Sequence, residues 1–427
     1  MCGILGWIGD NLVHDYALLQ NIGNYLDHRG PDDHGEAQGH NFGFGFRRLS
    51  ILDLSESGRQ PMYDPSGRYL IVFNGEIFNY QELKDKELTH SNLQGSSDTE
   101  VLLNLLIERG KDAIPLLNGM FAFCFLDTYE KQFIIARDRF GIKPFYYTLQ
   151  NGTFYFASEL KALTSFPNNY FSINETAVYD FLGTGYLSGE QSIFKEVKKL
   201  PPATFYQASY DEPLNNITPK LYWSLNYKSR FEGTYEEALD KFEALFDDAV
   251  NIRLRSDVPI GLFLSGGIDS GLVAAFASKY KQIDCYNVNY EETAKSEWEL
   301  ANKTANHLNF PLTSLKLASK NILDDIDQLA YYYDEPFGDS SALPSFNVCK
   351  AGSAQATVFL TGDAGDEAFA GYSRYIRKIQ GKNWDQKGAL FKILNGLSGI
   401  MPLRLQNKWY KLTAPQNLKD AYYDEVP

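Results

Sequence analysis

The chain has 427 residues, of which 44% are hydrophobic and 22% charged, and its formal net charge is −14. At roughly 100–200 residues per domain, this length predicts two or three compact units. The hydrophobic share excludes a disordered chain, no apolar run reaches the ~18 residues of a membrane span, and the acidic charge argues against general binding to nucleic acid or anionic lipid. No basic segment precedes an apolar stretch at the N-terminus, so we expect a soluble, cytoplasmic protein.

Residues 1–165 are expected to form strands and turns, interrupted by two helices. Aromatic and β-branched runs predict strands at 121–126, 132–136, 144–148 and 153–157. Apolar residues at helical spacing predict helices at 13–25 and 98–109. This combination predicts antiparallel sheets with helices packed outside, an α+β arrangement.

The pattern changes after a breaker-rich stretch, which we interpret as a linker at residues 201–230 between a first domain (2–200) and a second (231–427). In the second domain, helices predicted at 236–255, 269–280, 295–309 and 322–333 alternate with strands predicted at 259–264, 283–289, 312–317 and 357–360. Such alternation predicts an α/β domain with a mostly parallel sheet and helices on both faces.

Cys2 is distinguished by its position in the chain. The four cysteines (Cys2, Cys124, Cys285 and Cys349) are too widely spaced for a disulfide framework or a zinc site. If Met1 is removed, Cys2 carries a free α-amine, whose ordinary pKa of about 7.7–8.0 lets it act as a base toward the adjacent thiol. For the dipeptide alone, an ordinary cysteine near the chain start is the alternative.

Five further residues fit an amino-acid site beside that thiol. Asn74 and the N–H of Gly75 follow an apolar strand and are suited to an oxyanion hole. The Arg48 guanidinium is suited to an α-carboxylate, and the carboxylates of Glu76 and Asp98 to an α-ammonium. The alternatives are that Arg48 is a surface strand residue and that Asp98 is a helix N-cap.

Seven segments occur in one order over most of residues 1–165: 1–6, 28–33, 48–53, 74–79, 97–100, 118–123 and 137–144. Together they resemble the glutaminase domain of asparagine synthetases, which are class II, N-terminal-nucleophile glutamine amidotransferases. The resemblance implies a four-layered α/β/β/α sandwich. It makes Cys2 the nucleophile and Asn74 and Gly75 the oxyanion donors, places Arg29 in a lid-like region, and assigns glutamine binding to Arg48, Asn74, Glu76 and Asp98.

A second set of motifs lies in the second domain. Residues 263–270 (FLSGGIDS) stand between a predicted strand and a helix, where glycines and helix N–H groups suit a phosphate and Asp269 suits Mg²⁺. Residues 361–367 (TGDAGDE) follow another apolar strand, so both loops should meet at the carboxyl edge of the sheet. The alternative for this segment is that Asp363 and Asp366 only cap the next helix.

These two motifs resemble the pyrophosphatase-loop (PP-loop) ATP site of the asparagine synthetase C-terminal domain, a family that forms an acyl-adenylate and lets ammonia attack it. The resemblance implies ATP and Mg²⁺ as cofactors and Asp363 as the acid that assists ammonia attack. It assigns Mg²⁺ to Asp269 and Asp366, and the nucleotide and its pyrophosphate to Leu264, Ser265, Gly266, Gly267, Asp269, Ser270, Val288, Thr361 and Gly362.

The chain departs from this family at three points. Residues 333–344 contain no Arg or Lys, Asp363 stands where many members have Glu, and the chain stops where the family usually continues, so we expect a C-terminally truncated second domain. The leading hypothesis is a glutamine-hydrolysing asparagine synthetase acting on small molecules. A related ligase that amidates a uronic acid sugar, or a glutaminase only, are the alternatives, and a homodimer is one arrangement that the sequence allows.

Overall fold

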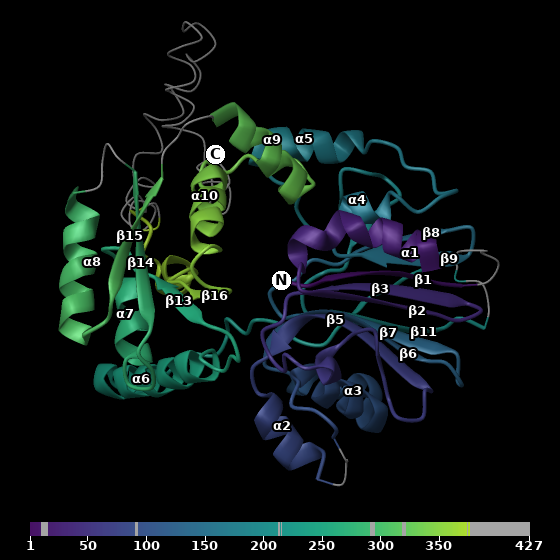
Figure 1. The fold of residues 1–427 in the computed structure, drawn as a ribbon, viewed down its shortest axis with the longest axis horizontal. Helices are drawn as coiled ribbons and strands as arrows, with labels where there is room; N and C mark the ends of the chain where they lie inside the picture. The colour runs from purple at the N-terminus through teal and green to yellow at the C-terminus, as the bar shows by residue number, and fades with distance from the viewer. Residues whose placement is uncertain are drawn as a thin grey trace, which may run out of the picture.

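The computed structural model describes residues 1–9, 16–89, 93–211, 214, 216–290, 295–317, 322–373 and 375. The start of the helix predicted at 13–25 and the part of the predicted second domain beyond residue 375 lie outside these described residues. Figure 1 shows two units side by side, an N-terminal unit built on two stacked sheets and a C-terminal unit with helices around a smaller sheet.

The first sheet of the N-terminal unit is antiparallel, with the strand order β10-β8-β9-β1-β3-β2. Its strands are β1 (Gly3–Ile8), β2 (Asp33–Gln38), β3 (Phe42–Arg48), β8 (Tyr146–Gln150), β9 (Thr153–Ala157) and β10 (Lys198–Lys199). All six residues of β1 are buried, because this strand lies between β3 and β9 and is covered on both faces. The segment that follows Cys2 is therefore fixed at the centre of the unit.

The second sheet is also antiparallel, with the order β12-β11-β7-β6-β5-β4. Its strands are β4 (Met62–Tyr63), β5 (Tyr69–Ile77), β6 (Gly119–Asp127), β7 (Gln132–Arg137), β11 (Thr204–Ser209) and β12 (Lys220–Leu221). Both β11 and β12 lie inside the stretch 201–230 that we interpreted as a linker. The breaker residues near 211–216 thus connect two paired strands of this sheet.

Helices cover the outer face of each sheet (Figure 1). They are α1 (Tyr16–Gly23) and α4 (Leu160–Leu163) on the side of the first sheet, and α2 (Tyr80–Glu87) and α3 (Asp98–Arg109) on the other. The helix α5 (Glu175–Thr184) lies farther from the first sheet than α4 (Figure 1). On β1, Ile4 and Ile8 pack between the sheets, whereas Leu5 and Trp7 pack against the helices. This alternation of burial confirms the predicted α/β/β/α sandwich.

The second unit has a parallel sheet with the order β15-β14-β13-β16. Its strands are β13 (Ile260–Phe263), β14 (Asp284–Tyr290), β15 (Leu312–Leu317) and β16 (Val358–Leu360). Its helices are α6 (Tyr235–Ile252), α7 (Ile268–Ala277), α8 (Lys295–Leu308), α9 (Ile322–Tyr333), α10 (Ala342–Gly352) and α11 (Gly365–Phe369). Since the chain moves from β13 to β14 on one side and later to β16 on the other, a ligand crevice is expected at the carboxyl ends of β13 and β16.

The two units contact each other through backbone and charged groups. Asp53 N donates to the Asp257 carboxylate at 2.8 Å, and Asp257 N donates to Ile51 O at 3.0 Å. Arg255 forms an ion pair with Glu82 at 2.6 Å. The loop at 51–53 is therefore held directly by the segment that leads into β13.

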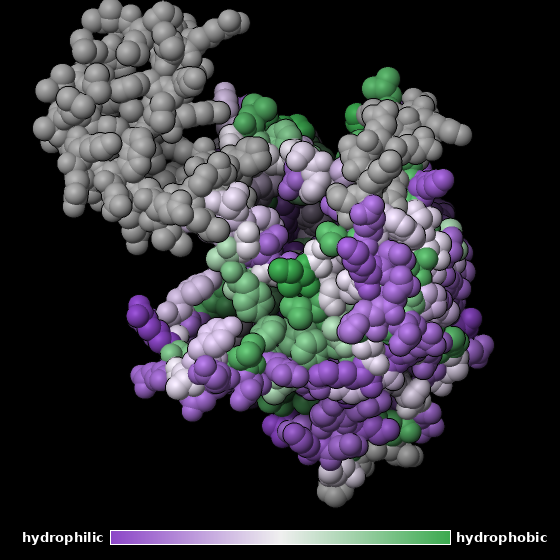
Figure 2. Space-filling model, turned by 90° about the vertical axis from the view of Figure 1, so that its left-hand side faces the viewer, coloured by the Kyte–Doolittle hydropathy of each residue, from purple (hydrophilic) through white to green (hydrophobic). Residues whose placement is uncertain are grey.

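Figure 2 views the molecule from the side of the second unit and shows hydrophobic side chains gathered across the middle of this face. Ile268, the first residue of α7, is 80% exposed. The turn between β13 and α7 is therefore open to solvent. In the part of the chain that the structure describes, no helix has the length and apolarity needed to cross a membrane.

Candidate active site

A cavity of about 190 Å³ lies where the start of β1, the end of β3 and the second half of β5 come together. It is lined by every residue for which the sequence predicted a role in glutamine hydrolysis or glutamine binding, namely Cys2, Arg48, Asn74, Gly75, Glu76 and Asp98. The structure thus gathers residues from four separate motifs around one space.

Cys2 is half-buried at this cavity, directly before β1. Leu49 N lies 3.5 Å from the Cys2 sulfur and donates to it, and the thiol lies 3.7 Å from Leu49 O. Arg29 Nε donates to the Cys2 carbonyl oxygen at 3.0 Å. Both the backbone and the sulfur of Cys2 are therefore held in place.

Asn74 is fully buried, and neither its amide nitrogen nor its amide oxygen has a hydrogen-bond partner among the described residues. At the next position, a Cβ would lie 2.6 Å from the Phe73 ring and 2.8 Å from Phe121 Cα, so only glycine fits at Gly75. A buried polar group without a partner costs roughly 1–3 kcal/mol. The Asn74 amide is therefore available to a ligand in the cavity.

Two carboxyl groups line the same cavity. Burial, reinforced by the charge of Asp98, raises the pKa of Glu76 to about 7. Burial also raises the pKa of Asp98 to about 6, although Asp98 accepts a hydrogen bond from Ile77 N at 2.8 Å. A cationic ligand would favour the ionised form of both groups.

The structure excludes the alternatives that Arg48 is a surface strand residue and that Asp98 is a helix N-cap. Arg48 is only 6% exposed, and its guanidinium donates to the carbonyls of Ser55 at 3.1 Å and of Asp53. It therefore holds the loop that walls the cavity. The N-cap of α3 is Ser97, whose side chain accepts from Glu100 N at 3.2 Å, and Asp98 is the first helical residue.

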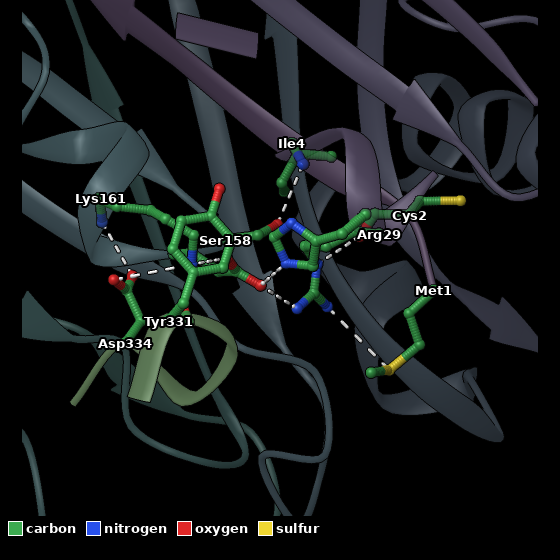
Figure 3. A network of polar contacts seen from close by, with 10 residues as sticks. Met1, Cys2, Ile4, Arg29, Ser158, Lys161, Tyr331 and Asp334 are labelled. Atoms are coloured by element: carbon green, nitrogen blue, oxygen red, sulfur yellow. Dashed lines mark hydrogen bonds and ion pairs between the residues drawn. The ribbon is translucent and has the colours of Figure 1, made fainter. Parts of the chain in front are cut away.

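A buried polar network leads from the cavity to the second unit, and Figure 3 follows it from Cys2 through Arg29 to Lys161 and Asp334. At its centre, the Glu159 carboxylate accepts from Arg29 at 2.7 Å and from His28 at 3.0 Å, and pairs with Lys161. Although burial opposes it, the hydrogen bonds from His28, Lys161 and Arg29 and the charge of Arg29 lower the pKa of Glu159 to about 2. Lys161 N in turn donates to Asp334 at 2.8 Å.

The second predicted site surrounds the turn 264–267 between β13 and α7. Ser265 Oγ lies 2.8 Å from Ser270 Oγ and accepts a hydrogen bond from Gly267 N at 3.1 Å. A Cβ on Gly362 would lie 2.6 Å from Ser270 N. The loop after β16 therefore packs directly against the turn after β13.

The other predicted residues of this site lie on or just after β13, β14 and β16. Leu264 is buried and Val288 is half-buried on β14. Gly266 follows Ser265 within the turn, and a Cβ at this position would lie 3.0 Å from Leu300 Cβ of α8. Thr361 Oγ1 donates to the exposed Asp363 carboxylate at 2.8 Å. The N-cap of α11 is Ala364, without a side-chain cap bond, and Asp366 lies inside the helix, so the alternative that Asp363 and Asp366 only cap α11 is wrong.

The two predicted Mg²⁺ ligands lie on touching segments. A Cβ on Gly365 would lie 2.5 Å from Asp269 Cγ, and Asp366 is the next residue in the chain. Among the described residues, no three His, Cys, Asp or Glu side chains form a group that could hold a metal ion. Because Mg²⁺ is commonly held by one or two carboxylates together with phosphate oxygens, the donor set still fits this ion.

The two sites are separate, but one strand connects them. Thr357 and Val358, at the start of β16, line the Cys2 cavity. The same strand ends at Leu360, and Thr361 and Asp363 follow immediately. At ~3.3 Å per residue, the chain from Val358 to Asp363 spans no more than roughly 17 Å.

Several residues of the cavity were not predicted from the sequence, among them Gln60 and Lys143. Gln60 accepts from Phe73 N at 2.6 Å and donates to Thr99 Oγ1 at 3.3 Å, which ties β5 to α3. Lys143 lines the cavity and is only 4% exposed. Lys143 stands in the segment 137–144, which is one of those that carry the family resemblance. Its place in that segment is the feature of the sequence that could have indicated a site residue.

Comparisons with known proteins match the regions of the chain that contain the two sites. Residues 1–223 match the family model of the glutamine amidotransferase domain, and residues 241–424 match that of asparagine synthase. The chain is 33% identical to glutamine-hydrolysing asparagine synthetase 1 of Bacillus subtilis, over 99% of this chain and 67% of that protein. It is also 33% identical to the putative asparagine synthetase 2 of Methanocaldococcus jannaschii, over 97% of this chain and 85% of that protein.

A more distant relative has a different name. The amidase chry2 of Gibberella zeae is 30% identical over 84% of this chain and 55% of its own length. The two family models, the long alignments to asparagine synthetases and the gathered motif residues lead to one assignment. The chain belongs to the family of glutamine-hydrolysing asparagine synthetases.

Proposed function

We propose that this chain is a glutamine-dependent amidoligase that converts aspartate, glutamine and ATP into asparagine, glutamate, AMP and pyrophosphate. The observation that supports it most directly is the unpartnered Asn74 amide beside Cys2, in a cavity that also holds two carboxyl groups of raised pKa. We further expect this chain to act in the cytoplasm, where ATP and glutamine are available. We also propose that it forms a homodimer, which light scattering would test.

In the proposed glutaminase reaction, the α-amine of the processed Cys2 takes the thiol proton and the sulfur attacks the side-chain amide of glutamine. Asn74 Nδ2 and Gly75 N would donate to the oxyanion that forms. Ammonia leaves with the proton from the amine, and water then cleaves the thioester to give glutamate. Glu76 and Asp98 would hold the substrate ammonium group.

In the proposed ligase reaction, the turn after β13 would bind the pyrophosphate of ATP through its N–H groups and hydroxyls. The acceptor carboxylate attacks the α-phosphorus, pyrophosphate leaves, and ammonia then displaces AMP from the acyl-adenylate. Asp363 would take a proton from the attacking ammonia. Asp269 and Asp366 would hold Mg²⁺, which neutralises phosphate charge when bound.

The strand β16 supports an internal route for ammonia. It borders the Cys2 cavity at its start and carries Thr361 and Asp363 just beyond its end. Ammonia released beside Cys2 is a nucleophile only in its neutral form, and an enclosed apolar path would keep it neutral. The short span along this one strand is compatible with such transfer.

The proposed activity is tested by ATP–pyrophosphate exchange and amide formation with the full chain. We expect exchange that depends on aspartate, and asparagine formation from either glutamine or added ammonium. Cys2→Ala should lose glutamine use and keep the ammonium-dependent reaction. No exchange with aspartate would exclude asparagine formation, and loss of both nitrogen sources in Cys2→Ala would contradict separate sites.

A second candidate is amidation of a different carboxylate, such as a uronic acid sugar. The observation in its favour is that the two lysines reaching the segment at Asp334 and Glu335 are already paired: Lys161 with Asp334 at 3.6 Å and Lys199 with Glu335 at 2.6 Å. Neither cation is free for the α-carboxylate of aspartate. Pyrophosphate exchange with a panel of uronic acids, but not with aspartate, would select this candidate.

A further inference from the structure

Two of the cations near Cys2 are committed to the protein itself. Arg29 Nη1 binds Glu159 at 2.7 Å while its Nε holds the Cys2 carbonyl at 3.0 Å, and Figure 3 shows the Cys2 sulfur on the side away from the Arg29 guanidinium. The Arg48 guanidinium donates hydrogen bonds to the carbonyl oxygens of the loop at 52–55. Neither guanidinium is positioned to face the sulfur as its counter-charge.

Lys143 differs from these two arginines. It lines the Cys2 cavity with only 4% of its surface exposed. Among the described residues, the structure records no hydrogen bond or ion pair of its ammonium group. An unpaired charge inside a protein is costly, so a buried ammonium that faces a cavity calls for an anion in that cavity.

The backbone of Lys143 is held firmly toward the cavity. The buried Asp138 carboxylate accepts from Lys143 N at 2.9 Å and from Ile142 N at 2.9 Å. On the other side, Arg137 Nε donates to Lys143 O at 2.7 Å. These contacts fix the turn before Lys143, so its side chain is presented to the cavity by a rigid segment.

The charged groups that act on the Lys143 ammonium are Arg29, Cys2, Glu76 and Asp138. Burial, together with the charge of Arg29, lowers the pKa of Lys143 to about 8, which leaves it mainly charged at pH 7. Glu76 cannot fully compensate this charge, since burial raises the pKa of Glu76 to about 7. The cavity therefore retains a net positive group beside the nucleophile.

We propose that Lys143 is a positioning residue that stabilises negative charge at the Cys2 sulfur and, after thioester hydrolysis, at the γ-carboxylate of the released glutamate. The proposed role of Lys143 at the glutamate carboxylate rests on the proposed function. Its proposed role at the Cys2 sulfur does not, because it concerns the free thiol before any substrate binds. Lys143 acts by its charge on these two groups and takes no proton in this scheme.

Two alkylating agents of equal size and different charge test the proposal on the unmodified protein. Iodoacetate carries a negative charge and iodoacetamide does not, and both transfer their carbon to a thiolate with loss of iodide. We expect the iodoacetate-to-iodoacetamide rate ratio to be about tenfold higher at Cys2 than at the exposed Cys349, an effect that one cation in a medium of effective dielectric ~20 gives even at a separation of roughly 12 Å. Mass spectrometry of the separate peptides measures both rates.

Variants then assign the effect to Lys143. Lys143→Met keeps the length of the side chain without its charge, and the rate ratio at Cys2 should fall about tenfold, whereas Lys143→Arg should keep it within about twofold. Lys111→Met, at an exposed lysine of the same domain, is the matched control and should change nothing. Thermal unfolding of each variant shows whether it is folded.

A purely structural role of Lys143 would slow both reagents equally and leave the ratio unchanged, and that result would overturn the proposal. Equal ratios at Cys2 and Cys349 in the unmodified protein would do the same. Alkylation requires no glutamine turnover. A protein that fails to hydrolyse glutamine but shows the expected ratios would therefore contradict the proposed function and leave the role of Lys143 intact.

Discussion

Asn74 is the residue for which the structure makes the sharpest prediction. Its amide is buried without a partner among the described residues, which lowers the stability of the ligand-free protein. The same amide can stabilise an oxyanion that forms beside it during the reaction. Asn74→Ala should therefore lower kcat for glutamine hydrolysis by about 10²–10³ with a smaller change in KM, while thermal stability stays equal or rises.

Asn169→Ala is the matched control, because the Asn169 amide likewise has no partner among the described residues but does not line the cavity. Steady-state kinetics and thermal unfolding of both variants check the prediction. An unchanged kcat in Asn74→Ala would remove this residue from the oxyanion hole.

The carboxyl groups of Glu76 and Asp98 predict a proton release on ligand binding. At pH 7, Glu76 with its pKa of about 7 is roughly half protonated, and an α-ammonium group would drive it to the ionised form. Titration of Cys2→Ala with glutamine in buffers of different ionisation enthalpy should show roughly half a proton released at pH 7 and much less at pH 8. Glu76→Gln should remove most of this release.

The carboxyl groups of Glu76 and Asp98 also determine in which direction the stability of the ligand-free protein changes with pH. Their pKa values in the folded chain, about 7 and about 6, lie above the ordinary values of 4.5 and 3.8 for these side chains, so the folded state binds more protons. Their contribution to the free energy of unfolding is therefore complete at a pH below their ordinary pKa values. It is lost as the pH rises through their higher pKa values in the folded chain. Comparing denaturant unfolding of the wild type with Glu76→Gln between pH 5 and pH 8 isolates the Glu76 part; a difference that does not change with pH would contradict it.

At the scale of the elements, the contact between the β13–α7 turn and the loop after β16 leaves no room for a side chain. A Cβ at Gly362 would lie 2.6 Å from Ser270 N, so Gly362→Ala must separate the two loops. We expect ATP–pyrophosphate exchange to fall by about tenfold or more while glutamine hydrolysis at the other site persists.

The control for this change is Gly183→Ala on α5, where a Cβ meets no atom within 4 Å. This second variant should keep both activities, because alanine favours a helix over glycine by ~1 kcal/mol and fills open space. If Gly362→Ala retained full exchange, the loops would not form one nucleotide site.

The elements themselves were predictable where a hydrophobic period was strong. The strand predicted at 312–317 and the helix predicted at 322–333 coincide with β15 and α9, and the strand predicted at 121–126 lies within β6. By contrast, β2 is mostly polar and half-exposed, so it carries no apolar alternation. The glycines of β3 weaken its strand signal.

The site was predictable from motifs only as far as residue types allow. Cys2, Asn74 and Asp98 have chemistry that attracts attention in a sequence, and the structure gathers them. Lys143 was missed because lysine is almost always exposed, and nothing local indicates that a particular lysine is buried. Thr357 and Val358 were missed because their place at the cavity depends on how two units pack together, which no local pattern encodes.

At the scale of the whole molecule, the network through Glu159 predicts a link between the two activities. Lys161 is hydrogen-bonded and paired to Asp334 across the contact between the units. Removing this charge in Asp334→Asn leaves Lys161 less well held, and coupling through such networks changes by roughly twofold or more in rate. Glutamine hydrolysis should continue while the ratio of glutamate to amide product rises above that of the wild type.

Asp211→Asn serves as the control, since Asp211 forms an exposed pair with Lys131 within the first unit. Exposed pairs contribute little, so the product ratio should match the wild type. A ratio that is unchanged in Asp334→Asn as well would show that this contact does not couple the two reactions.

The place of β16 has one more consequence. Because Thr357 and Val358 close one side of the space around Cys2, the first unit cannot complete that enclosure by itself. Separating the second unit from the first would remove this side of the cavity. Bulky maleimides should then react with the Cys2 sulfur faster than in the intact protein, so their rate of reaction would report whether the two units are docked.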